Sequence, residues 1–164
     1  MLSSLLSCLR ERIFVFTLLW AGFIFAISFL ATPLKFLAPS LTLPVAMEIA
    51  YLHFHTFNGI EIGFSLLILT ITLLGELSLR ARLSTALIVT LLATQTALLY
   101  TVMDARTIAI IEGSEPSVRS YHSIYVGLEV VKLVALLYLA HIQLKEHEAM
   151  LARVASNAPR AAQS

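Results

Sequence analysis

The sequence YHSIYVGLEVVKLVALLYLAHI, residues 121–142, determines the class of this protein. It is apolar over a length that matches the ~20 residues with which an α-helix crosses the hydrocarbon core of a bilayer. Glu129 and Lys132 lie three positions apart inside it. Ionisable groups at membrane depth are costly, and they mark functional sites. We therefore predict a transmembrane helix here and expect the function to depend on this charged pair.

Composition assigns the whole chain to the membrane class. Of its 164 residues, 59% are hydrophobic and 13% are charged, and the mean hydropathy is +0.88. A soluble domain could not bury so much apolar surface. Four stretches are long and apolar enough to cross a bilayer, residues 13–31, 49–74, 83–103 and 121–142. We predict an all-α polytopic membrane protein, with four transmembrane helices in one antiparallel bundle within residues 1–150 and a disordered cytoplasmic tail, residues 151–164.

The distribution of basic residues predicts the orientation in the membrane. With the N-terminus in the cytoplasm, the residues on the inner side are Arg10, Arg12, Arg80, Arg82, Lys145, Arg153 and Arg160, against Lys35, Arg106 and Arg119 outside. This is the positive-inside bias, so both termini are predicted to be cytoplasmic in a multi-pass protein of the cell inner membrane. The net charge of +1 gives no reason to expect nucleic acid. The bilayer is the expected surrounding, and a homodimer or a membrane partner subunit is compatible with so small a bundle.

The connections between the spans carry turn signals. Pro33, Pro39 and Pro44 are predicted to preclude a continuous helix through the first outer connection. The inner connection, residues 75–82, is short and polar, so spans two and three are expected to be antiparallel neighbours. Residues 104–120 form the second outer connection.

Two helices carry polar side chains along one face. On the fourth span an arc of about 80° holds His122, Tyr125, Glu129 and Lys132. The second span repeats that spacing with Glu48, Tyr51, His55 and Asn58, and Glu61 lies about 60° further round. Exposing either face to lipid would cost several kcal/mol per charge. We therefore predict an outward-facing polar pocket between spans two and four, with Lys35, Asp104 and Arg106 at its rim.

Individual polar positions also have a purely structural interpretation. Glu129 and Lys132 can neutralise one another and hold two helices together, and buried ion pairs are weak indicators of activity. Gln95 in span three is expected to form an interhelical hydrogen bond, and Trp20 in span one to face lipid or pack. The number of polar groups on the two facing helices favours function over structure alone.

Three classes of function fit these residues, and none assigns a catalytic group. The first is a non-enzymatic protein that binds or moves a small solute, proton or metal ion, with Glu61, Glu129 and Lys132 as its ionisable core. The second is a membrane-embedded haem or quinone redox protein, in which His55 and His122 ligate haem or a transition metal. The third is a subunit or scaffold of a larger membrane complex. The sequence contains no recognisable hydrolase motif and no phosphate-binding loop.

Two aromatic-histidine segments resemble a known family. Tyr51-Leu52-His53-Phe54-His55 opens the second span and Tyr121-His122 opens the fourth. They are similar to segments of the small four-helix membrane proteins typified by vertebrate transmembrane protein 205 and its bacterial relatives. The resemblance implies a four-helix bundle with His55 and His122 at matching positions, a link to metal-drug tolerance and no assigned catalysis.

The chain also departs from that family. Glu61, Glu129 and Lys132 have no counterpart in its pattern. The layout further resembles that of the haem-binding protoporphyrinogen oxidase of bacterial membranes, which has four spans with a histidine and a lysine in the bundle, although the local sequences do not match.

Overall fold

The computed structural model describes residues 9–75, 77–113 and 120–161, and within these ranges it contains helices and no β-strand. Its elements in chain order are α2 (Ile13–Ile24), η1 (Phe25–Ala31), α3 (Thr32–Lys35), α4 (Leu43–Leu74), α5 (Leu79–Leu98), η2 (Leu99–Met103), α6 (Asp104–Ile111) and α7 (Ser120–Ala161). Four helical runs are long and apolar enough to cross a membrane, Ile13–Lys35, Leu43–Leu74, Leu79–Ile111 and Tyr121–Ser156. The prediction of an all-helical protein with four such helices is confirmed. Its orientation in a membrane stays a prediction.

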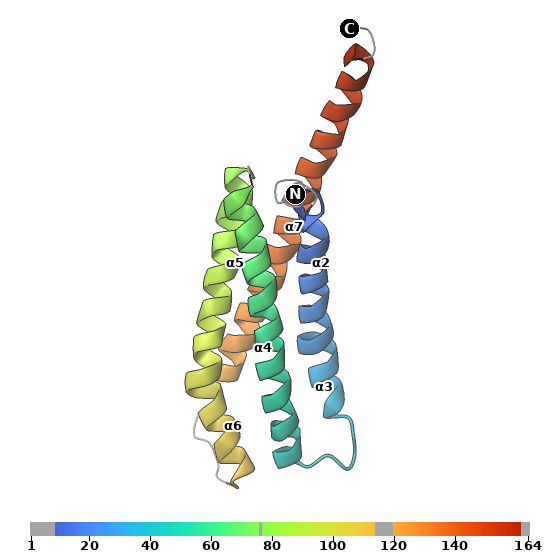
Figure 1. Ribbon diagram of the computed structural model, residues 1–164. Coiled ribbons are helices and arrows are strands. Elements are labelled where there is room, and N and C mark those ends of the chain that lie inside the picture. Colours follow the sequence, from blue (N-terminus) through green and yellow to red (C-terminus); the bar gives the residue numbers. More distant parts are fainter. Residues whose placement is uncertain (1–8, 76, 114–119, 162–164) are drawn as a thin grey trace.

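The four helical runs lie side by side (Figure 1). α2 packs against α7 and α4, and α5 packs against α4 and α7. α4 and α7, which carry the two predicted polar faces, therefore lie diagonally opposite one another. The start of α2, the connection from α4 to α5 and the later part of α7 lie at one end (Figure 1). α3, the start of α4 and α6 lie at the other, which we call the α3–α6 end.

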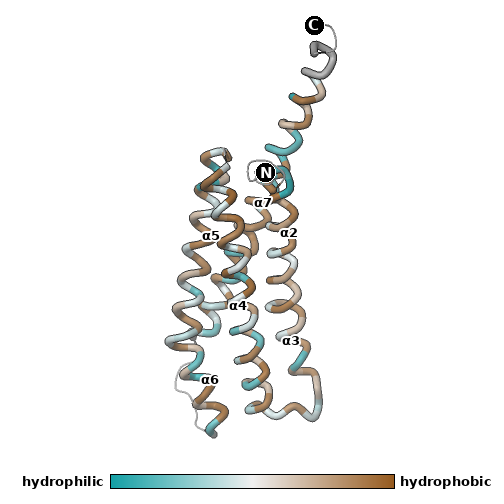
Figure 2. Tube along the Cα trace, in the orientation of Figure 1, coloured by the Kyte–Doolittle hydropathy of each residue, from teal (hydrophilic) through white to brown (hydrophobic). Residues whose placement is uncertain are grey.

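The interior combines an apolar core with a group of buried polar and charged side chains, and much of the exterior is apolar, unlike that of a soluble protein. The buried polar side chains include Asn58, Glu61, Gln95, Glu129 and Lys132. Large apolar side chains project outward along every helical run, and apolar colour dominates the long helices in Figure 2. Leu37 and Leu73 are 74% and 70% exposed. An apolar exterior of this extent indicates a lipid environment.

The first helical run does not end at residue 31 as predicted. It widens into the π-helix η1 and continues through Pro33 as α3. In an α-helix each carbonyl accepts a hydrogen bond from the N–H four residues later, and proline has no N–H to donate. A π-turn joins residues five apart, so a carbonyl can accept from the residue after the proline instead. The Thr32 hydroxyl donates to the carbonyl of Ile27, five residues earlier, at 2.8 Å. Pro44 lies in the first turn of α4, where a missing N–H costs nothing.

Two segments predicted to be irregular are helical. α6 occupies Asp104–Ile111 of the predicted second outer connection, of which residues 114–119 lie outside the described part. α7 continues to Ala161, through most of the predicted disordered tail, whereas residues 162–164 lie outside the described part. Alanine and leucine favour helix in this stretch, and an ion pair between Lys145 and Glu148, 2.9 Å apart, supports the turn of α7 that precedes it.

Candidate functional site

Glu61, Glu129 and Lys132 meet in the interior, and we call them the buried triad. Lys132 Nζ lies 2.6 Å from Glu61 Oε1 and 3.0 Å from Glu129 Oε2. All three residues are at most 1% exposed. Lys132 and Glu129 come from one face of α7, and Glu61 comes from α4 on the diagonal. The spacing of the two polar faces therefore directs both acids toward the same ammonium group.

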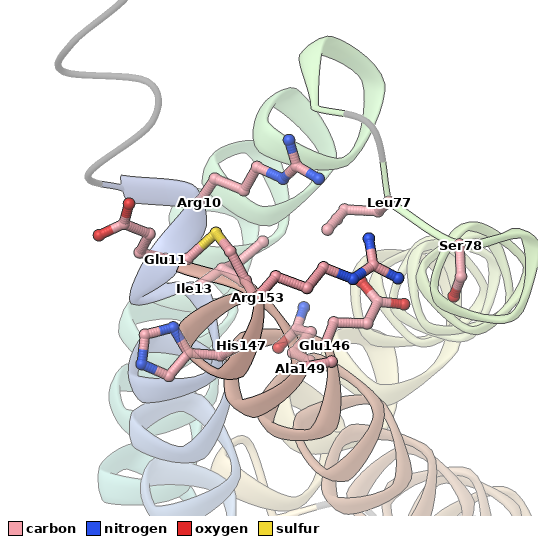
Figure 3. Close-up of a pocket in the computed structure, with 11 residues that line it drawn as sticks. Arg10, Glu11, Ile13, Leu77, Ser78, Glu146, His147, Ala149 and Arg153 are labelled. Carbon is pink, nitrogen blue, oxygen red and sulfur yellow. The ribbon is translucent and has the colours of Figure 1, made fainter. Parts of the chain in front are cut away.

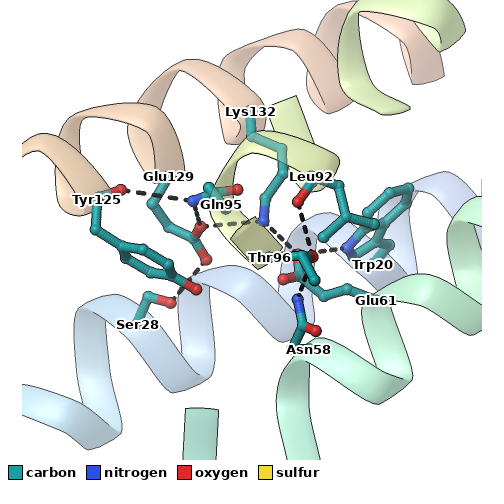
Figure 4. A network of polar contacts seen from close by, with 10 residues as sticks. All are labelled: Trp20, Ser28, Asn58, Glu61, Leu92, Gln95, Thr96, Tyr125, Glu129 and Lys132. Atoms are coloured by element: carbon teal, nitrogen blue, oxygen red, sulfur yellow. Dashed lines mark hydrogen bonds and ion pairs between the residues drawn. The ribbon is translucent and has the colours of Figure 1, made fainter. Parts of the chain in front are cut away.

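Side chains from the other two helical runs complete the first layer around the buried triad (Figure 4). Trp20 Nε1 in α2 donates to Glu61 Oε1 at 2.9 Å. Ser28 Oγ in η1 donates to Glu129 Oε1 at 2.9 Å. Gln95 Nε2 in α5 donates to Glu129 Oε2. Every helical run thus supplies a polar group, and the position of each carboxylate is fixed by more than one bond.

Three acceptors of the site are unpaired. Glu61 Oε2, Asn58 Oδ1 and Gln95 Oε1 are buried and have no hydrogen-bond partner among the described residues, and Lys132 Nζ is bound there through its two ion pairs alone. The Asn58 amide nitrogen donates instead to Thr96 Oγ1 at 2.8 Å. Buried polar atoms are normally paired, so each exception requires an explanation. With both carboxylates ionised and Lys132 charged, the buried triad carries one net negative charge, and a bound proton or cation would supply what these oxygens lack.

A cavity of about 300 Å³, the inner cavity, reaches Glu129 from the α3–α6 end. Its lining includes Ser28, Thr32, Phe36, Phe54, His122, Tyr125 and Glu129. Tyr125 is buried, and its ring packs edge-on against Phe54 with centroids 5.7 Å apart. Figure 4 shows the ring extending toward Ser28 and Glu129. One carboxylate of the buried triad therefore borders open space.

A second cavity of about 300 Å³, the rim cavity, adjoins the first at the α3–α6 end. The two share lining residues, Thr32, Phe36, Phe54 and His122. Lys35, Asp104 and Arg106 also line the rim cavity, as the sequence predicts for the rim. Residues from α3, α4, α6 and α7 thus line two neighbouring cavities between this end of the molecule and Glu129.

The remaining predicted site residues lie near these two cavities or away from them. His55 Nε2 lies 2.9 Å from Asp104 Oδ1, and the ring packs against Tyr51 and Tyr100 at 4.3 and 4.7 Å between centroids. Tyr51 lines the rim cavity. Glu48 is exposed and lines neither cavity.

The two histidines predicted as metal or haem ligands have different surroundings. His55 is held by Asp104, whereas His122 lines both cavities. Within residues 9–75, 77–113 and 120–161, no group of three or more His, Cys, Asp or Glu side chains is arranged to hold a metal ion. A metal or haem bound by His55 and His122 stays a hypothesis.

Sequence reasoning missed two members of the site. Trp20 is 1% exposed and bonded to Glu61, so it does not face lipid. Ser28 bonds Glu129 from a π-turn that no sequence pattern indicates. Gln95 forms the expected interhelical hydrogen bond, and its partner is Glu129.

A third cavity, of about 370 Å³, lies at the opposite end. Figure 3 shows Arg10, Arg153, Glu146 and His147 among the side chains that line it. Between this cavity and the buried triad, α7 places Leu136 and Leu139, both 0% exposed, in the apolar core. Glu129 of the buried triad therefore borders a cavity on the α3–α6 side, whereas tightly packed side chains lie between the buried triad and the opposite end.

Comparison of the chain with protein families, with curated proteins and with solved structures gives no match. The resemblance to the transmembrane protein 205 family stays a prediction.

Proposed function

We propose that this protein binds a proton at the buried triad and exchanges it with the inner cavity, as a membrane carrier that couples a proton to a small solute does. The observation that carries the proposal is the charge of the site, two carboxylates and one ammonium group in a fully buried position. A net charge in a medium of low polarity is costly. One proton makes the buried triad neutral. It also supplies a donor to a site in which Glu61 Oε2, Asn58 Oδ1 and Gln95 Oε1 have no hydrogen-bond partner among the described residues.

Access from one side supports the proposal further. Glu129 borders the inner cavity, and His122 lies where the two cavities adjoin. The apolar core around Leu136 and Leu139 closes the other side. A site open to one side only is the arrangement that a carrier needs, because a continuous wet path would let protons leak. By the positive-inside bias, the open side is the outer one, with both termini in the cytoplasm of an inner-membrane protein.

Infrared spectroscopy of the purified protein tests the proposal. At neutral pH the wild type is expected to show the carbonyl stretch of a protonated, buried carboxyl group, shifted in heavy water because the proton exchanges through the inner cavity. Either Glu61→Gln or Glu129→Gln removes one negative charge and leaves a neutral carboxylate–ammonium pair. Each single variant is therefore expected to lose the band.

Glu48→Gln is the matched control, since Glu48 lies on the same helix as Glu61 and is exposed. This variant is expected to keep the band. A wild type without the band, or a band that survives in both Glu61→Gln and Glu129→Gln, would contradict a proton held by the buried triad.

A further inference from the structure

The rim cavity combines an apolar wall with basic groups. Its apolar lining includes Leu43, Met47, Phe54, Leu99, Met103 and Ile110. Lys35, Arg106 and His122 line it as well. Such a surface suits a ligand with an apolar body and a charged head.

Among the described residues that line the cavity, the positive charges are not balanced. Asp104 is the one acid among them, and this carboxylate is bonded to His55. Lys35 Nζ donates to the carbonyl of Ala46 at 3.2 Å, a neutral partner. Arg106 Nε is buried and has no hydrogen-bond partner within the described ranges. A buried guanidinium donor without a partner calls for an anion.

We infer that the rim cavity binds a small organic carboxylate with an apolar body, whose head is held by Arg106 and Lys35. The inference rests on the proposed function, because it names the solute that the proton would accompany. A volume of about 300 Å³ holds roughly ten water molecules at ~30 Å³ each, and we take a ligand of about ten non-hydrogen atoms as its match. This is the size of octanoate and far below that of a phospholipid. The planar fork of arginine matches a carboxylate in shape.

The neighbouring inner cavity gives this ligand a charge partner. A carboxylate at Arg106 lies in the space that adjoins the cavity bordered by Glu129. One proton at the buried triad and one monoanion in the rim cavity add no net charge to the protein. Passage of the pair would therefore be electrically neutral, and a charge would not have to cross the apolar core alone.

Equilibrium dialysis of radiolabelled octanoate against the full-length protein in a neutral detergent tests the inference. Octanoate is expected to bind saturably, and octanol, which keeps the chain and lacks the charge, is expected to bind about tenfold more weakly or worse. Arg106→Gln and Lys35→Gln are each expected to weaken octanoate binding by about tenfold and to leave octanol binding unchanged. Lys145→Gln, at the exposed opposite end, is the matched control and is expected to bind octanoate as the wild type does.

The inference would be overturned by octanol binding as tightly as octanoate, or by octanoate affinity that Arg106→Gln and Lys35→Gln both leave intact. Displacement of octanoate by phosphatidylglycerol at equal affinity would also overturn it, since the site would then take a lipid head group. The proposed function is tested separately, because it fails if the infrared spectrum of the wild type lacks the band of a protonated carboxyl group. Octanoate binding without that band would leave an anion site with no proton partner.

Discussion

At the scale of single residues, Lys132 is the group on which the interior depends. Its ammonium contacts both buried carboxylates, and its side chain is 0% exposed. A buried ion pair contributes little net stability relative to apolar residues, because desolvation offsets attraction. Removing one partner is different, because the charge left behind is buried without compensation. The stability of the protein is therefore expected to respond to the balance of charge in the buried triad.

Lys132→Met is expected to lower the free energy of unfolding by about 3–5 kcal/mol, because the acidic side chains of Glu61 and Glu129 lose the ammonium group that offsets their charges. Adding Glu61→Gln to Lys132→Met removes one of these charges and is expected to recover part of the loss. The measurement is unfolding by a denaturing detergent in mixed micelles. It is followed by the fluorescence of Trp20, the single tryptophan of the chain, which is bonded to Glu61.

Lys145→Met is the control for this cycle, since Lys145 forms an exposed pair with Glu148, and exposed pairs contribute little. A double variant no more stable than Lys132→Met would show that charge imbalance is not the cause of the loss.

The candidate site was predictable where polar residues repeat along a helix. Glu61, Glu129 and Lys132 belong to faces that the helical period reveals, and the structure brings all three together. Trp20 and Ser28 lie among the apolar residues of the first run, and so few polar positions do not indicate which partners they meet. The pairing of His55 with Asp104 joins α4 to α6, and which residues meet between two helices depends on tertiary packing.

At the scale of elements, the existence of the four long helices followed from hydropathy, whereas their ends did not. A span predicted from apolar composition stops where the composition changes, but a helix stops where its backbone bonds stop. α7 illustrates the difference, because it continues past the packed core as an exposed helix of good helix formers, with Leu151 and Val154 53% and 64% exposed. Pro33 shows a helix that continues where the sequence predicts an end, because a π-turn allows the helix to pass a residue that normally ends it.

The two parts of α7 are expected to tolerate proline differently. Ala152 is exposed beyond the packed region and Ala135 is 9% exposed within it. Proline costs about 3 kcal/mol in a helix interior. For Ala152→Pro that cost falls on a segment that packs little, so helical content should drop slightly and the unfolding midpoint should stay. Ala135→Pro is expected to lower the midpoint strongly, because the helix on both sides of it carries the buried triad and the apolar core.

Circular dichroism during thermal unfolding measures both quantities for the proline variants, with Ala152→Gly and Ala135→Gly separating the lost hydrogen bond from the lost methyl group. If Ala152→Pro lowered the unfolding midpoint as much as Ala135→Pro, the last part of α7 would be an integral part of the packed fold.

At the scale of the whole molecule, the two ends differ in charge as well as in access to the buried triad. The end with the α4–α5 connection and the later part of α7 carries the arginines and lysines that the sequence assigns to the cytoplasm, among them Arg10, Arg82 and Lys145. The α3–α6 end carries Lys35 and Arg106, both half-buried at the rim cavity. Basic residues next to membrane helices favour the cytoplasmic side, so the proton and anion sites are expected to open outward.

Labelling of single cysteines measures this orientation directly. Cys8 is the one cysteine of the chain, so Cys8→Ser gives a background without thiols. Glu112→Cys places a thiol at the exposed end of α6, and Ser156→Cys places one on the exposed far part of α7. A membrane-impermeant maleimide is expected to label Glu112→Cys in intact cells and to label Ser156→Cys only after permeabilisation, while a permeant maleimide labels both throughout. The reverse pattern would turn the open cavities toward the cytoplasm, and the proton and the carboxylate would then have to be taken up from inside the cell.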